Sequence, residues 1–169
     1  MPPACPPGSG DLRPAAPDDA AAVASLLREL CAGDAAEASR AAGAATAPGP
    51  AGHEAWVATG VGGILGFLAL EPSSQPRFAV GSVDWIAVAP AARRQGLGLR
   101  LLRLAQERAG ALGWRQLHAC TFHTNRPALH LYVEAGFYPA ATLPDYAAPG
   151  LHYVELVWCP GRTPRRGRP

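Results

Sequence analysis

The sequence contains few cysteines, and they are not arranged as in a metal site or a disulfide framework. The four are scattered along 169 residues without any Cys-x-x-Cys pair: Cys5, Cys31, Cys120 and Cys159. Zinc-type spacing is therefore missing. We expect reduced thiols, no bound metal and a cytoplasmic protein.

Long apolar runs are also lacking. None approaches the roughly 18 residues that a membrane-spanning helix requires. The first ten residues, MPPACPPGSG, have neither the basic nor the apolar region of a secretory signal. These absences predict a soluble, cytoplasmic chain with no membrane partner.

Charge is sparse, at 17% of residues, and the net charge is only +2. Much of that excess lies in the last nine residues, GRTPRRGRP. So mild a balance argues against nucleic acid as a partner. We expect one domain over residues 11–159, between a disordered Pro/Gly-rich lead-in at 1–10 and a disordered basic tail at 160–169.

The sequence alternates between helical and strand-like stretches, which predicts an α/β or α+β protein with a mixed sheet. Pro17, Asp18 and Asp19 mark a helix start. The apolar residues that follow at helical spacing are Val23, Leu26, Leu27 and Leu30. The Ala/Gly-rich stretch 33–52 stays open, since alanine favours a helix and glycine and proline interrupt it. The expected strands are 11–15, 55–60, 61–70, 77–90, 115–123 and 151–158. Besides the helix that begins near Pro17, the expected helices are 97–112 and 125–136.

Two local signals have structural meaning. Gly66, inside an expected strand, predicts a β-bulge or a close approach of another segment. Asn125, Pro127 and Gly136 fit the N-cap, the first turn and the end of one short helix.

The segment IAVAPAARRQGLGLRLL, residues 86–102, reads as strand, turn and helix. The Walker pattern is absent, and the dinucleotide pattern GxGxxG fails because Leu101 stands at its third glycine. What remains is Arg-x-x-Gly-x-Gly from Arg93 to Gly98. Taken alone, it fits a phosphate cradle at a helix N-terminus or simply a basic turn.

The surrounding sequence resembles the GNAT superfamily of acyl-CoA N-acyltransferases. VDWIAVAPAARRQGLGLRLL (83–102) is similar to its cofactor motif, and NRPALHLYVEAGF (125–137) to its segment N-x-x-A-x-x-L-Y-x-x-x-G-F. The similarity runs in matching order over roughly residues 11–158. It implies a mostly antiparallel sheet of six to seven strands with a central parallel splay, flanked by about four helices.

The resemblance further implies acetyl-CoA as co-substrate. Its pyrophosphate would lie on the backbone N–H groups of residues 94–99, with charge from the two arginines, and its pantetheine along the strand edge at 86–88. The implied cofactor residues are Ile86, Ala87, Val88, Arg93, Arg94, Gln95, Gly96, Leu97, Gly98, Leu99, Asn125 and Ala128.

Members of the superfamily transfer the acyl group directly to an amine. Tyr132 occupies the position of the acid that protonates the leaving thiolate, a task that suits a phenol with a pKa of about 10. The alternative is that Tyr132 only belongs to the core face of its helix. The backbone N–H of Val88 is the implied oxyanion donor.

The general base is not at its usual place. Where some relatives carry a glutamate, this chain has Cys120, which is a poor base at an ordinary thiol pKa. Asp84, acting through water, is the first substitute and His118 the second. For either residue, an ordinary hydrogen-bonded position in a strand is the alternative.

The acceptor residues implied by the resemblance are Trp56 and Tyr146. For Tyr146, the alternative is a loop aromatic that packs on the sheet. Asp145 and Glu155 could attract an ammonium. The acceptor would be a primary amine of a small molecule, an amino acid or a peptide N-terminus. Dimers are frequent in the superfamily, which leaves a homodimer open. Two other readings remain: a non-catalytic acyl-CoA sensor and a binder of nucleotide phosphates.

Overall fold

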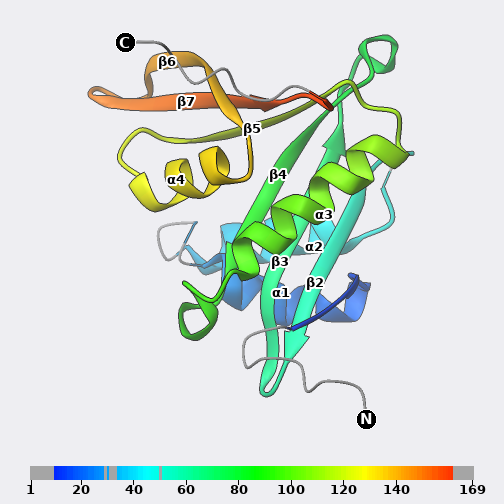
Figure 1. Ribbon diagram of the computed structural model, residues 1–169. Helices are drawn as coiled ribbons and strands as arrows, with labels where there is room; N and C mark the ends of the chain where they lie inside the picture. The colour runs from blue at the N-terminus through cyan, green and yellow to red at the C-terminus, as the bar shows by residue number, and fades with distance from the viewer. Residues whose placement is uncertain (1–9, 29, 31–33, 50, 162–169) are drawn as a thin grey trace. The chain divides into compact units, whose positions relative to one another are not determined.

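The computed structural model describes residues 10–28, 30, 34–49 and 51–161 (Figure 1). The expected lead-in and tail fall almost wholly on residues 1–9 and 162–169, outside the described residues. The chain forms two compact units. The first takes in the chain up to Leu70 together with Asp84–Leu101, and the second takes in Glu71–Val83 and the chain from Leu102 onward.

Seven strands form a sheet in the order β1-β2-β3-β4-β5-β7-β6. β4 and β5 run parallel, with Val80 opposite Gln116 and Val83 opposite Ala119, whereas the pairs β1/β2, β2/β3, β5/β7 and β6/β7 are antiparallel. The mixed sheet predicted from the sequence is thereby confirmed. Its strands are β1 (Asp11–Pro14), β2 (Glu54–Gly60), β3 (Gly63–Pro72), β4 (Val80–Val88), β5 (Gln116–Phe122), β6 (Tyr138–Ala148) and β7 (Leu151–Trp158), and the α-helices are α1 (Ala20–Leu27), α2 (Ala35–Thr46), α3 (Leu97–Ala111) and α4 (Arg126–Glu134).

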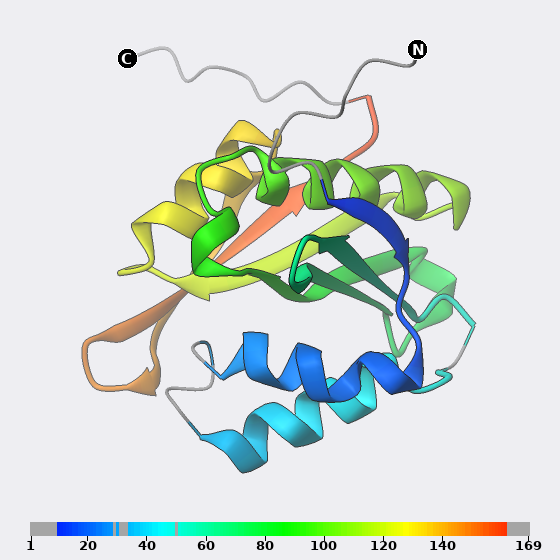
Figure 2. The ribbon, with the colours of Figure 1, turned by 90° about the horizontal axis from the view of Figure 1, so that it is seen from below.

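In the first unit, α1 and α2 lie side by side against strands β2 and β3 (Figure 2). Their inward positions are small or branched, which lets the two helices pack closely on the sheet. The fully buried core residues of this cluster include Val23, Leu27, Ala42, Val57 and Phe67. This core supports β4, since Ala87 belongs to the same cluster.

The stretch left open in the sequence contains helix α2. Asp34 begins it, because its Oδ1 accepts the N–H groups of Ala36 and Glu37 at 2.8 and 2.9 Å. Its alanines supply the buried face and favour a helix, so the helix forms although the stretch also contains glycine and proline. The preceding helix α1 ends at Leu27, whereas Leu30, expected on its apolar face, is exposed.

Both features that the sequence suggested for Gly66, a β-bulge and a close approach of another segment, are found at this position. The register of β2 and β3 shifts between Ala58 and Thr59, and Gly66 is the residue opposite Ala58. A Cβ on Gly66 would lie 3.1 Å from Leu101 and 3.2 Å from Leu97. The glycine thus lets the start of α3 pack directly on the strand.

The second unit joins β5, β7 and β6 with helix α4. Asn125 caps this helix as predicted, with its Oδ1 accepting the N–H of Ala128 at 3.3 Å. α3 is tied to it, because the side-chain amide of Gln106 donates to the carbonyl of Ala135 at 2.6 Å. Strand β6 was not predicted; it forms a long hairpin with β7 (Figure 1).

Candidate active site

The Arg-x-x-Gly-x-Gly segment forms a tight turn between β4 and α3 in the first unit. The Nε of Arg93 donates to the carbonyl of Val88 at 2.9 Å, which closes the turn. Arg94 and Gly96 both have positive φ, at 59° and 80°. Because Arg94 is not a glycine, its left-handed conformation is uncommon.

Helix α3 begins at Leu97, and its first intrahelical bond runs from the N–H of Arg100 to the carbonyl of Gly96 at 3.1 Å. The N–H groups of residues 97–99 precede that bond, so they have no acceptor within the helix. The side chains of Arg93 and Arg94 are exposed at this positive end of the helix. Backbone donors and two cations make the turn suitable for a phosphate group.

The strand before the turn presents its residues to different surroundings. Ala87 is buried in the core, whereas Ile86 and Val88 are half-buried and Asp84 is exposed. Trp56, on β2 of the same unit, donates its indole N–H to Glu54 at 3.3 Å. The first unit therefore contains the expected phosphate turn, the strand at 86–88, Asp84 and Trp56.

Tyr132 lies on α4 in the second unit and is 3% exposed. Its ring packs edge-on against Phe137, with centroids 5.3 Å apart. Burial raises the pKa of the Tyr132 phenol well above its usual range, and the Cys120 thiolate adds a smaller effect in the same direction. The phenol therefore keeps its proton at any physiological pH, and Cys120 is among the groups that act on it.

Cys120 lies opposite Glu155 in the antiparallel β5/β7 pair. Partial burial, and then the charge of Glu155, raise the pKa of the Cys120 thiol. The thiol is accordingly protonated at neutral pH and cannot act as the base. A carboxylate is nevertheless present at this point of the sheet, on the neighbouring strand.

His118 precedes Cys120 by two residues, on the same face of β5. Its Nδ1 is 2.7 Å from Oε1 of Glu155, and its Nε2 is 3.0 Å from Oε1 of Gln116. The side chains of His118 and Glu155 are 28% and 31% exposed, so both are partly accessible to solvent. A carboxylate that holds one imidazole nitrogen is the usual arrangement for orienting a histidine base.

Tyr146 belongs to β6 and not to a loop, and it is exposed. Its ring meets Tyr153 edge-on at 4.7 Å, and Tyr153 lies 4.5 Å from Phe122. Asp145, beside it, has a positive φ and accepts the N–H of Gly150 at 2.7 Å.

The second unit thus brings His118, Cys120 and Tyr132 into one neighbourhood, together with Glu155. The sequence indicated Glu155 only as a nearby acid, and Gln116 was missed. Strand register decides both, because the β5/β7 pairing puts residues 118 and 155 within reach across 37 positions of sequence. Alternation along β5 was the signal that could have found Gln116.

Metal sites and membrane spans can be judged only for the described part of the chain. Within it, no cluster of three or more His, Cys, Asp or Glu side chains could hold a metal ion. Among the same residues, no helix is both long enough and apolar enough to cross a membrane.

This fold and these motifs define the acyl-CoA-dependent acetyltransferases. The model of the acetyltransferase (GNAT) family matches residues 25–137, so the chain belongs to that family. The predictions of the family, the fold and an acetyltransferase enzyme are confirmed. No curated protein sequence matches the chain significantly.

Solved structures of similar fold come from several bacteria. A GCN5-related N-acetyltransferase from Kribbella flavida matches with a TM-score of 0.78 and 23% identity, over 90% of this chain and 99% of its own. A GNAT-family acetyltransferase from Streptococcus pneumoniae matches with a TM-score of 0.71 and 24% identity, over 88% and 98%. The structure of yncA from Salmonella typhimurium with its cofactor acetyl-CoA matches with a TM-score of 0.71 and 18% identity, over 89% and 94%.

Proposed function

We propose that this protein is an N-acetyltransferase that moves the acetyl group of acetyl-CoA directly to a primary amine. The turn from Arg93 to Gly98 is the observation that carries the proposal. It combines helix N–H donors, two exposed arginines and the positive φ of Gly96. The similar yncA structure contains acetyl-CoA, which supports the same co-substrate here.

In this proposal, the N–H groups of residues 94–99 bind the pyrophosphate, and Arg94 adds charge. Arg93 closes the turn through the bond from its Nε to the Val88 carbonyl, and its guanidinium keeps its positive charge at any pH. The strand at 86–88 receives the pantetheine arm, and the N–H of Val88 stabilises the charge that develops on the thioester oxygen. Asn125 and Ala128 are assigned to the same co-substrate.

Tyr132 is the proposed acid. The amine nitrogen forms a bond to the thioester carbon while the carbon–sulfur bond breaks, and the Tyr132 O–H gives its proton to the departing sulfur. Burial raises the pKa of the phenol, so Tyr132 holds its proton before the transfer but is a weaker acid than an ordinary tyrosine. The nitrogen of the new amide still has to lose a second proton, which passes through solvent to the Tyr132 phenolate and restores the phenol.

His118 is the proposed base, in place of Asp84. His118 takes one proton from the substrate ammonium and so produces the amine that can attack. Glu155, 2.7 Å from Nδ1, orients the ring and stabilises its positive charge. Two observations favour His118 as the base: its contact with Glu155, and its position on the same face of β5 as Cys120.

A turnover assay tests the proposed function. Acetyl-CoA and a panel of primary amines are incubated with the protein, and free CoA thiol is followed together with the mass of the acetylated amine. The His118→Asn variant should lose most of the rate and keep its affinity for CoA in calorimetry. Tight CoA binding without turnover on any amine would favour the sensor, and preference for ATP over CoA would favour a nucleotide binder.

We also propose the cytoplasm as the working compartment. Cys120 and Cys159 are free thiols, which a reducing environment maintains.

A further inference from the structure

The hairpin of β6 and β7 has an irregular end (Figure 1). The register shifts between Leu143 and Ala148, and Asp145 lies within that shift, so its backbone N–H is not committed to the ladder. It donates instead to the side chain of His152 on β7, with 3.0 Å between the amide nitrogen and Nδ1. An imidazole thus takes the place of a strand carbonyl at this point of the hairpin.

This bond fixes the position of the proton on the His152 ring. A backbone N–H can only donate, so Nδ1 must offer its lone pair and carries no proton. The neutral ring therefore has its proton on Nε2. A ring that gained a second proton would carry it on Nδ1 and would lose the bond to Asp145. A metal ion on Nε2 would likewise require the proton on Nδ1, so this histidine is not arranged as a metal ligand.

Asp145 closes the same turn through its side chain. Its φ of 53° is uncommon for a residue other than glycine, and its Oδ1 accepts the N–H of Gly150 at 2.7 Å. A residue keeps such a conformation only where the surrounding bonds hold it. His152 supplies one of these bonds and Gly150 the other, so the turn depends on the charge of one imidazole.

Two other titratable groups face His152. Oδ1 of Asp145 is 3.6 Å from its Nδ1, within reach of a charged ring but already bonded to Gly150. The ring of His123, just after β5, stacks on it with centroids 4.7 Å apart. Nδ1 of His123 lies 3.2 Å from the backbone nitrogen of His152 and 3.3 Å from its carbonyl oxygen, so His123 is bonded with or without a proton there. Within the described part of the chain, no further titratable side chain bonds or stacks on His152.

We propose that His152 is a pH-sensitive switch at the end of the β6/β7 hairpin, closed by the neutral imidazole and opened when the ring gains its second proton. Protonation breaks the bond to the N–H of Asp145 and draws its Oδ1 toward the charged ring and away from Gly150. Tyr146, the next residue, then leaves the position in which its ring meets Tyr153 edge-on. The switch is closed near the upper end of the range of about pH 5 to 8 in which histidines change charge, and it opens as pH falls. It does not depend on the proposed acetyl transfer.

The test is an NMR titration of the full-length, nitrogen-15-labelled protein from about pH 8 to about pH 5. At the upper end, the imidazole resonances of His152 should show an unprotonated Nδ1 and a protonated Nε2. The amide resonance of Asp145 should titrate with the same midpoint as this ring. Its hydrogen-exchange protection factor should fall by about fivefold, as the loss of one hydrogen bond implies. A protonated Nδ1 at the upper end, or an Asp145 amide that does not follow the ring, would overturn the switch.

Two variants separate the acceptor from the charge. His152→Asn should hold the switch closed, because the asparagine Oδ1 can accept the Asp145 N–H in place of Nδ1 and does not titrate. The response of the Asp145 amide to pH should then be mostly lost. His152→Phe keeps a ring beside His123 but has no acceptor, so its Asp145 amide should have the low protection factor throughout. Full protection in His152→Phe would contradict the proposal.

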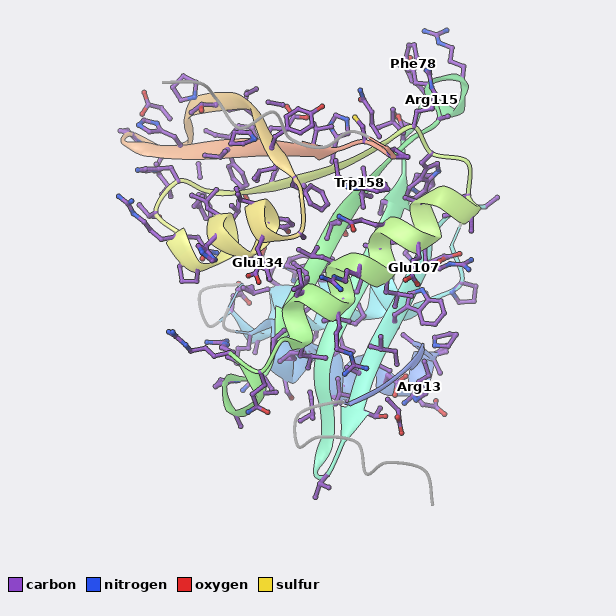
Figure 3. The ribbon with its side chains drawn as sticks, viewed as in Figure 1. Arg13, Phe78, Glu107, Arg115, Glu134 and Trp158 are labelled. Atoms are coloured by element: carbon purple, nitrogen blue, oxygen red, sulfur yellow. The ribbon has the colours of Figure 1, made fainter. Side chains whose placement is uncertain are left out.

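His130→Asn is the matched control. It also removes an imidazole from the second unit, but the His130 side chain is 83% exposed on α4 and its partner is Glu134, at 3.9 Å. Figure 3 shows Glu134 on the side of α4 away from β7. The titration of the Asp145 amide should be unchanged in this variant. An equal loss of that titration in His130→Asn and His152→Asn would assign the effect to overall charge and overturn the switch.

Discussion

Glu155 and His118 approach each other from neighbouring antiparallel strands, with 2.7 Å between Oε1 and Nδ1. If this pair is the base, its members act as one unit. We expect His118→Asn and Glu155→Gln each to lower kcat/KM, with His118→Asn the more severe. The double variant should be little worse than His118→Asn, because groups that act together are not additive. The check is a double-mutant cycle on acetyl transfer, with CoA affinity as control; fully additive losses would separate the two residues.

Removal of the Tyr132 hydroxyl should slow transfer without affecting the fold. Tyr132→Phe keeps the buried ring and its edge contact with Phe137, so the melting temperature and CoA affinity should stay near those of the parent. We expect kcat to fall on the order of 100-fold, the lower end of what a general acid contributes. Steady-state and single-turnover rates measure this loss. An unchanged kcat would assign Tyr132 to the core alone.

Cys120 offers a probe of the charge on Glu155. Partial burial and that charge raise the pKa of the thiol, so less thiolate is present at a given pH than for an ordinary cysteine. With the other three cysteines replaced by serine, Cys120 should react slowly with iodoacetamide at pH 8 and faster as pH rises. Glu155→Gln removes one of the two causes, so it should accelerate the reaction at fixed pH. A slower reaction in that variant would contradict the assignment.

The turn before α3 should be sensitive at Gly96. A Cβ at this position meets nothing within 4 Å, but the φ of 80° is strained for any other residue. Gly96→Ala should therefore cost about 1 kcal/mol in the free energy of unfolding and weaken CoA binding. Gly110→Ala is the matched control, since Gly110 lies within α3 with open space around its Cβ. It should stabilise the protein and leave CoA binding unchanged, as urea unfolding and calorimetry can show.

Asp19 should make stability depend on pH in the acid range. Its carboxylate accepts both Arg13 guanidinium bonds, at 2.7 and 2.8 Å, and the N–H of Ala16. The bond from Arg13 is the largest of the causes that lower the pKa of Asp19. Its stabilisation is thus complete above the pKa of the unfolded chain, about 3.9, and is lost as pH falls through the lower folded value.

Asp19→Asn should accordingly cost about 0.5–1 kcal/mol at pH 7, because solvent weakens a pair in which Arg13 is exposed. The difference from the parent should shrink below about pH 4. Urea unfolding from pH 7 to pH 3 measures it. A difference that grows toward acid pH would have the wrong sign for a lowered pKa.

Local features of this fold could be predicted because each depends on a few adjacent residues. Asn125 caps a helix through a residue three positions away, and the glycine turn before α3 is set by its own backbone preferences. The bulge and the close packing at Gly66 could be predicted because a glycine weakens the interior of a strand unless the backbone there needs the space or the freedom.

Strand β6 could not be predicted for the opposite reason. Pro139 and Pro144 interrupt it, and nearly all of its residues are exposed, so no alternation of apolar and polar positions marks it. Its hydrogen bonds come from β7, and its register shifts between Leu143 and Ala148. Only the partner strand makes this segment a strand.

The hydrogen bond between Gln116 and His118 ties the orientation of the Gln116 amide to the imidazole beside it. Oε1 of Gln116 and Oε1 of Glu155 are both acceptors, so they satisfy an imidazole that carries a proton on each nitrogen. When Nε2 loses its proton, its lone pair would face an oxygen, and a half-turn of the Gln116 amide would present an NH2 group instead. The two orientations of the Gln116 amide therefore suit two different forms of the imidazole.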